Sequence, residues 1–111
     1  MLTEIFGAYP QVKVIDLLLT HQNIEYTKEE IAECAGISRD VLDTFWAQLE
    51  KYRIIKPTRK TRNAQLYTTN MDSEAMLALK RFQYELAEVE IEEQMGLEIK
   101  RSESEKEAVI A

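Results

Sequence analysis

The chain has 111 residues, of which 20 are Asp or Glu and 14 are Lys or Arg, so its net charge is −6. This length has room for one domain and an appended helix, and it excludes two independent cores. The single cysteine (Cys34) and single histidine (His21) exclude an internal disulfide and a Cys/His zinc cluster within one chain, so we expect no metal site.

Membrane and secreted proteins are disfavoured by the same composition. No apolar run approaches the roughly 20 residues that cross a bilayer. The first residues include Glu4 and lack the basic-then-apolar pattern of a signal peptide. We therefore expect a cytoplasmic protein without a membrane partner. No Gly-rich phosphate loop and no Ser/His/Asp set is visible, so we expect no enzyme, no catalytic residue and no cofactor.

Two stretches of the chain carry opposite charge. Between residues 51 and 65 every charged side chain is basic, whereas residues 85–111 contain nine acids and three bases. A nucleic-acid-binding protein usually gathers Lys and Arg on one surface. The net acidity of the whole chain does not exclude a local basic surface of this kind. Residues 51–65, which contain no acid, are the candidate for it. Its bases are Lys51, Arg53, Lys56, Arg59, Lys60 and Arg62.

The N-terminal quarter predicts a short helix and a longer one. Residues 1–9 carry apolar side chains at helical spacing. Pro10 suits the first turn of the next helix, where a missing N–H costs nothing. This second helix is expected over residues 11–22 and should be buried, since most of its circumference is apolar. Residues 23–26 are too few for a helix and predict an extended link or a three-residue strand.

A tight turn is predicted between the next two helices. Thr27 and Glu30 have capping-box spacing at the start of a helix over residues 28–35. Gly36 can adopt the left-handed conformation that ends this helix. The turn that follows is short, so the next helix should cross the first one steeply.

Ser38 is expected to cap that next helix, over residues 39–52. Its apolar residues form one stripe, which should face the core. Trp46 lies beside the stripe and is expected in the core as well. The stripe consists of Val41, Leu42, Phe45, Leu49 and Tyr52.

A β-hairpin is predicted after this helix. Residues 54–56 begin a strand that Pro57 restricts to an edge position, because proline has no N–H for the ladder. Residues 65–69 alternate polar and apolar side chains and should form the return strand. Residues 59–64 are expected to form a polar loop, with Asn63 at positive φ.

A long helix is predicted over residues 71–95, capped by Asn70, Asp72 or Ser73, and residues 96–111 should form a flexible charged tail. Apolar residues recur along the helix with heptad spacing. They either pack on the chain's own first helix or bind a second copy. A helix of 20 residues spans about 30 Å, more than a domain this small covers, which favours the homodimer. The predicted dimer interface is Leu2, Phe6, Leu79, Phe82, Leu86 and Val89.

Residues 28–49 resemble a helix-turn-helix, with small Ala32 where the helices cross, Gly36 at the turn and Leu42 facing inward. The basic hairpin that follows would be the wing. Residues 11–69 are similar to the winged helix-turn-helix of bacterial and archaeal transcriptional regulators. The resemblance implies a mainly α fold with a small β-hairpin wing and a long C-terminal dimerisation helix. Residues 1–70 would form the winged domain with its N-terminal extension.

The resemblance also implies binding to double-stranded DNA as a homodimer, in the role of a transcriptional regulator. The helix over residues 39–52 would lie in the major groove, with Arg39 on guanine and Gln48 on adenine. The wing would contact the flanking backbone or the minor groove. The expected DNA-binding residues are Lys28, Ser38, Arg39, Thr44, Gln48, Lys51, Arg59, Lys60, Arg62 and Asn63.

Two acids leave another function open. Asp40 and Asp43 lie on the predicted groove-facing side, where a carboxylate repels phosphate. The alternative is a winged helix that binds protein, as an adaptor in a transcription, replication or segregation complex. No motif identifies a small-molecule effector.

Overall fold

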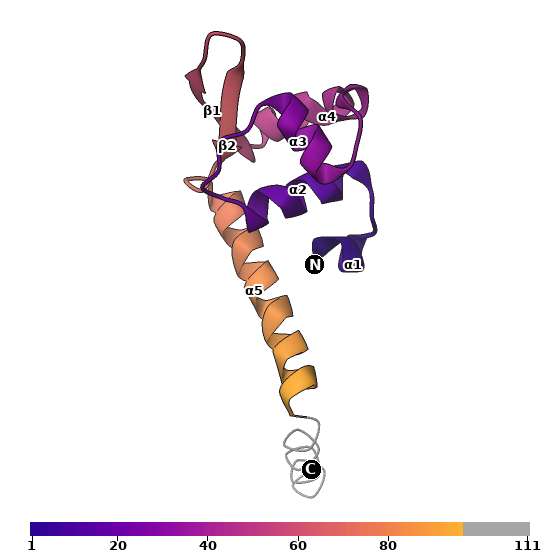
Figure 1. Cartoon of the computed structure of the whole chain (residues 1–111). Coiled ribbons are helices and arrows are strands. Elements are labelled where there is room, and N and C mark those ends of the chain that lie inside the picture. Colours follow the sequence, from indigo (N-terminus) through magenta and orange to yellow (C-terminus); the bar gives the residue numbers. More distant parts are fainter. Residues whose placement is uncertain (97–111) are drawn as a thin grey trace, which may run out of the picture. The chain divides into compact units, whose positions relative to one another are not determined.

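The computed structural model describes residues 1–96 (Figure 1). The chain divides into two compact units, the first being Met1–Lys80 and the second beginning at Arg81. The predicted mainly α fold with one β-hairpin is confirmed. Apart from Gly96, the predicted tail lies outside the described residues. The elements in chain order are α1 (Leu2–Phe6), α2 (Pro10–Thr20), α3 (Lys28–Ala35), α4 (Arg39–Lys51), β1 (Ile55–Lys60), β2 (Gln65–Thr69) and α5 (Glu74–Met95).

Local sequence signals set both ends of α3. The capping box is present: the Glu30 N–H donates to Thr27 Oγ1 at 3.1 Å, and the Thr27 N–H donates to the Glu30 carboxylate at 2.9 Å. At the other end Gly36 adopts φ 72°, and the Ile37 N–H donates to the Ala32 carbonyl at 2.9 Å. This bond turns the chain sharply into α4.

The buried stripe of α4 differs from the predicted one. Ser38 caps the helix as expected, and Trp46 is in the core as expected. Val41 and Tyr52, however, are exposed, so their predicted inward position was wrong. The reason is the helical period: positions i, i+3, i+4 and i+7 share one face. Val41 lies one place before that face, and Tyr52 lies beyond the last residue of α4. That face consists of Leu42, Phe45, Trp46 and Leu49.

The end of α4 uses the same bond pattern as α3 but without a glycine. Arg53 has φ 59°, the one positive φ outside glycine among residues 1–96. Its N–H donates to the Glu50 carbonyl at 3.1 Å, and the Ile54 N–H donates to the Leu49 carbonyl at 2.9 Å. An L-residue in this conformation is strained, and these two backbone hydrogen bonds accompany it at Arg53.

The hairpin begins and ends differently from the prediction. Strand β1 runs through Pro57 to Lys60, so Arg59 and Lys60 are strand residues and not loop residues. The loop is Thr61–Ala64, closed by the Thr61 N–H to the Ala64 carbonyl at 2.8 Å. The Thr61 hydroxyl adds two further bonds to Ala64, so the loop closes without a left-handed residue. The predicted positive φ at Asn63 is therefore wrong.

A β-bulge lies in β1. The pairs Pro57–Tyr67 and Lys60–Gln65 leave two residues of β1 opposite one residue of β2. An extra residue of this kind bends the strand and redirects its side chains. The bulged residues are Thr58 and Arg59, and their side chains lie together in the interface described below.

The core of the first unit lies between the three central helices and the hairpin stem (Figure 1). The Thr69 hydroxyl, buried, donates to the Leu18 carbonyl of α2 at 2.7 Å and fixes β2 on that helix. Tyr26 exchanges two backbone hydrogen bonds with Tyr67, both of 2.8 Å, so the predicted link contributes a single bridge and no strand. The buried cluster is Val14, Leu18, Tyr26, Ile31, Ala32, Leu42, Phe45, Trp46, Leu49 and Ile55.

Candidate nucleic-acid interface

The predicted groove-facing side of α4 is exposed to solvent. Ser38 Oγ accepts from the Val41 N–H at 3.1 Å, and the Thr44 hydroxyl donates to the Val41 carbonyl at 2.6 Å. Gln48 and Lys51 are exposed further along the helix, with the Lys51 ammonium 5.2 Å from the centre of the Tyr52 ring. The two hydroxyls thus stabilise the helix itself, while Gln48 and Lys51 present polar groups outward.

Arg39, the predicted guanine contact, is held by two carboxylates. Its Nε donates to Asp43 Oδ1 at 3.2 Å, one turn along α4, and its Nη1 forms an ion pair with Glu29 of α3. The hydrogen bond that Arg39 donates to Asp43, together with the negative charges of Glu29 and Asp43, raises the pKa of the Arg39 guanidinium. Arg39 therefore lies at the predicted place, but its donors are engaged within the chain.

Lys28 occupies the first turn of α3 and contacts α4. Its ammonium lies 4.7 Å from the centre of the Trp46 ring and 4.0 Å from Asp43 Oδ1. A cation over an indole ring is attracted by the π-electron density. Trp46 in turn meets the edge of the Tyr67 ring, with the centroids 4.8 Å apart. Lys28 thus adds a second cation beside Arg39, anchored on a core side chain.

The basic residues of the hairpin fall into two groups. In the stem, which here means the hairpin up to Arg59, both bases bind acids. Arg59 Nε donates to the Glu25 carboxylate at 2.8 Å, and Lys56 Nζ forms an ion pair with Asp72 at 2.9 Å. Toward the tip, Lys60 and Arg62 are exposed, and within residues 1–96 neither forms an ion pair. The tip therefore carries unneutralised positive charge, whereas the stem is neutralised by its own chain.

The helix ends and the wing tip meet at one polar recess of about 290 Å³. Lys28, Glu29 and Arg39 line it from α3 and α4. The hairpin contributes Asn63, Ala64, Gln65 and Tyr67. The structure thus brings Lys28, Arg39 and Asn63 of the predicted DNA-binding set together around one recess, where the start of α4 meets the wing tip.

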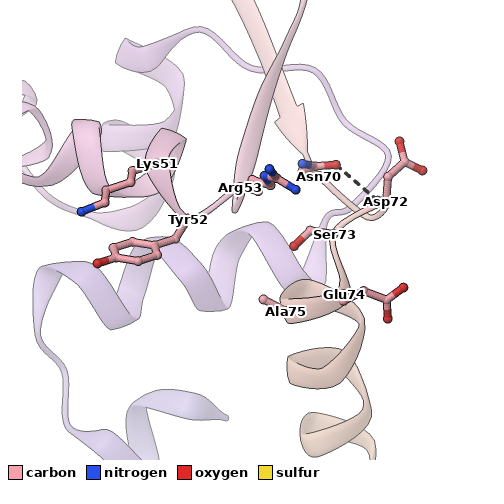
Figure 2. Close-up of a pocket in the computed structure, with 8 residues that line it drawn as sticks. All are labelled: Lys51, Tyr52, Arg53, Asn70, Asp72, Ser73, Glu74 and Ala75. Atoms are coloured by element: carbon pink, nitrogen blue, oxygen red, sulfur yellow. Dashed lines mark hydrogen bonds between the residues drawn. The ribbon is translucent and has the colours of Figure 1, made fainter.

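A larger pocket, of about 490 Å³, lies where α4 ends and α5 begins. Figure 2 shows Lys51 and Tyr52 on one side of it and Ser73, Glu74 and Ala75 on the other, with Arg53 beside Asn70. The Asp72 N–H donates to the Asn70 side chain at 3.3 Å, which folds the connection into α5 (Figure 2). The Ser73 hydroxyl accepts a hydrogen bond from the Met76 N–H. Of the three predicted N-cap residues of α5, Ser73 is therefore the one that caps the helix. The lining holds two bases, Lys51 and Arg53, and two acids, Asp72 and Glu74, so its charge selects no class of ligand.

The predicted dimer residues differ in how much surface they present. Leu2 is 2% exposed and packs within its own unit, so its side chain has almost nothing to offer a partner. Phe6 is 53% exposed and Val89 is 51% exposed. Phe82 is also exposed, whereas Leu79 and Leu86 are partly buried.

Among residues 1–96, no group of three or more His, Cys, Asp or Glu side chains is arranged to hold a metal ion. No helix in the same range is both long and apolar enough to span a membrane.

Two acidic residues of this interface were missed at the level of sequence. Glu25 and Glu29 lie 34 and 10 positions from the arginines that they bind. Helical spacing relates residues three or four apart, so it indicates the Arg39–Asp43 pair and neither of the other two. Only the tertiary fold brings Glu25 and Glu29 to the basic side chains.

No protein-family model matches the chain, and no curated protein matches it. Solved structures do. MepR, a transcription regulator of the Staphylococcus aureus multidrug efflux pump MepA, matches with a TM-score of 0.59 and 13% identity over 91% of this chain and 75% of MepR. The transcriptional regulator PA4135 matches with a TM-score of 0.54 and 20% identity over 97% of this chain and 80% of the other. A mutant of Lactococcus lactis ZitR in apo form matches with a TM-score of 0.56 and 18% identity over 96% and 80%. The chain has the winged helix-turn-helix fold of these regulators.

Proposed function

We infer that the chain binds double-stranded DNA sequence-specifically as a homodimer and regulates transcription. The observation that carries this inference is the shared recess: the starts of α3 and α4 and the tip of the hairpin line it together. A helix can enter the major groove while an adjacent wing contacts the flanking backbone only if both face the same way. Similarity in fold to three regulators supports the same function.

Roles follow from which side chains are available. Gln48 and Lys51 on α4 are exposed, and the amide of Gln48 matches the donor and acceptor of adenine in the major groove. Lys60 and Arg62 would neutralise phosphates beside the site, and Asn63 would add a hydrogen bond there. Ser38 at the start of α4 and Thr44 in its second turn are exposed and would contact phosphate through their hydroxyl groups. Arg59, bound to Glu25, is better assigned to positioning the wing than to contacting DNA.

Homodimer formation is supported by the apolar residues of α5. The helix has 22 residues, and its exposed apolar side chains include Val89 and Ile91. Burying such side chains against a second copy removes apolar surface from water. In a two-fold dimer the paired recognition helices match half-sites about one turn of DNA apart. Phe6 would join this interface, whereas buried Leu2 would support it from beneath.

The adaptor function remains the second candidate, and one observation favours it. Glu29 and Asp43 neutralise Arg39 and Lys28 on the very surface that should attract phosphate. A protein partner with polar groups would suit such a neutral, charge-patterned surface.

Selection from a pool of random duplexes separates the two functions. The full chain is incubated with the pool, bound duplexes are amplified through several rounds, and the enriched sequences are determined. We expect enrichment of an inverted repeat with half-sites about 10 base pairs apart. Recovery of unenriched, random sequences would remove sequence-specific binding and favour the adaptor.

A further inference from the structure

Four charged side chains of alternating sign form a connected chain at the start of the α3–α4 pair. Glu29 binds Arg39, Arg39 binds Asp43 at 3.2 Å, and Asp43 lies 4.0 Å from Lys28. The sum of the four charges is zero. Asp43 is shared by both cations through the same oxygen, Oδ1, so a change at Asp43 affects both at once.

This cluster lies where the proposed DNA would lie. Lys28, Glu29 and Arg39 all line the recess that they share with the wing tip. A neutral cluster releases no counterions from DNA, and counterion release supplies most of the affinity for an arbitrary sequence. Lys28 and Arg39 are therefore present on the interface without contributing the attraction that two unpaired cations would give.

The pairs are nevertheless able to exchange partners. Glu29 is mostly exposed, and Arg39 and Asp43 are both partly accessible. Ion pairs between exposed side chains are weak in water, because solvent competes for both partners. A guanine edge offers Arg39 two acceptors, and the amino group of cytosine or adenine offers Asp43 a donor. A phosphate offers an acceptor to Arg39 but only repulsion to Asp43.

We propose that Glu29 and Asp43 are specificity-determining residues, which keep Arg39 and Lys28 paired on arbitrary DNA and release them only where base edges replace the carboxylate contacts. This inference rests on the DNA binding proposed above. Its consequence is that the two acids lower affinity for every sequence but lower it least for the cognate one.

The test compares the double variant Glu29→Gln and Asp43→Asn with the unaltered chain. Fluorescence anisotropy measures Kd for the duplex recovered by selection and for a scrambled duplex of equal length, across a series of salt concentrations. We expect the double variant to bind the scrambled duplex about tenfold more tightly and to steepen its salt dependence by about two to four units of slope, up to one for each of the two released cations in each protomer of the dimer. The affinity for the cognate duplex should increase less, so the ratio of the Kd for the scrambled duplex to the Kd for the cognate duplex should fall.

Two further variants make the result specific to this cluster. Glu33→Gln with Glu88→Gln changes net charge by the same amount, but both residues are exposed and outside the recess. Adding Arg39→Ala to the double variant should reverse about half of the gain in slope, because the released guanidinium is then absent while the Lys28 ammonium remains. Circular dichroism melts establish that each variant is folded.

Equal changes in the double variant and the Glu33/Glu88 control would overturn the proposal, since they would reflect net charge alone. An unchanged Kd for the scrambled duplex in a folded double variant would overturn it as well. If the unaltered chain binds neither duplex at any salt concentration, the proposed function itself is wrong and this inference falls with it.

Discussion

The Nε atom of Arg59 donates a hydrogen bond to the Oε2 atom of Glu25 across 2.8 Å, although the two residues are 34 positions apart. The Thr58 hydroxyl donates to the same oxygen at 3.3 Å. Consecutive residues of a regular strand point to opposite faces. Here the bulge at Thr58 and Arg59 allows both side chains to bind one carboxylate. The stem of the wing is thereby attached to the link before α3, whereas Lys60 and Arg62 form no ion pair among residues 1–96.

Substitution of Lys60 and Arg62 by alanine should weaken binding to every duplex. Each lost phosphate contact lowers the slope of log K against log salt by roughly one unit. Because phosphate carries no sequence, the preference for the cognate duplex should stay unchanged. Anisotropy titrations measure both quantities. Lys13→Ala, on α2 away from the recess, serves as the control. Unaltered affinity and slope in the double variant would remove the wing tip from the interface.

Protonation of Glu25 should break its ion pair with Arg59 at a pH below the usual titration range of a carboxyl group. The hydrogen bond from Arg59 lowers the pKa of Glu25 from its ordinary value of 4.5. A lowered folded-state pKa means that the pair stabilises the fold above the unfolded-state value and that this contribution is lost as pH falls through the folded-state value. The Nε–Hε resonance of Arg59 should therefore shift with a midpoint below 4.5. Glu25→Gln should abolish the transition, and a midpoint at or above 4.5 in the unaltered chain would contradict the assignment.

Arg53→Gly should stabilise the protein, although glycine usually destabilises. An L-residue in the left-handed region costs about 1–2 kcal/mol. Glycine avoids this cost but loses about 0.5–1 kcal/mol through the greater freedom of the unfolded chain. The net gain should be about 0.5–1 kcal/mol in the free energy of unfolding, as determined by urea titration.

Gly36→Ala is the counterpart at the end of α3. No atom lies within 4 Å of the added Cβ, so steric contact contributes nothing and the backbone conformation decides the outcome. We expect a loss of about 1 kcal/mol in the same urea titration. A higher free energy of unfolding in Gly36→Ala, or a lower one in Arg53→Gly, would show that the left-handed conformations are not the source of strain.

Leu86→Glu should convert a dimer into a monomer. Leu86 belongs to the heptad positions of α5, and a buried carboxylate without a partner is costly. Sedimentation velocity at micromolar concentration distinguishes the two states. Glu88→Ala lies off the heptad seam and should leave the dimer intact. A Leu86→Glu variant that sediments as a dimer would place the interface elsewhere.

The sequence predicted the parts of the fold that depend on neighbouring residues. Thr27 with Glu30, Gly36 and Ser38 each act within one turn, so their patterns identified the helix ends directly. The loop conformation of Asn63 could not be predicted in the same way. It depends on which residue closes the hairpin, and the Thr61 hydroxyl does so.

The candidate site was harder to predict from the sequence than the fold. The basic segment indicated the wing, but it did not indicate that Arg59 and Lys56 bind acids of their own chain. Those pairs join residues that only the folded core brings together. The positive φ of Arg53 could not be predicted either, because arginine has no preference for this conformation.

The most direct test of DNA binding is fluorescence anisotropy of the unaltered chain with two labelled duplexes, the upstream region of its own gene and an unrelated sequence, over roughly 50 to 200 mM salt. If Lys51, Lys60 and Arg62 of each protomer contact phosphate, a dimer makes about six contacts, and log K should fall against log salt with a slope of about −5. We expect this slope together with tighter binding to the upstream duplex. Absence of binding to both duplexes at the lowest salt concentration would contradict it.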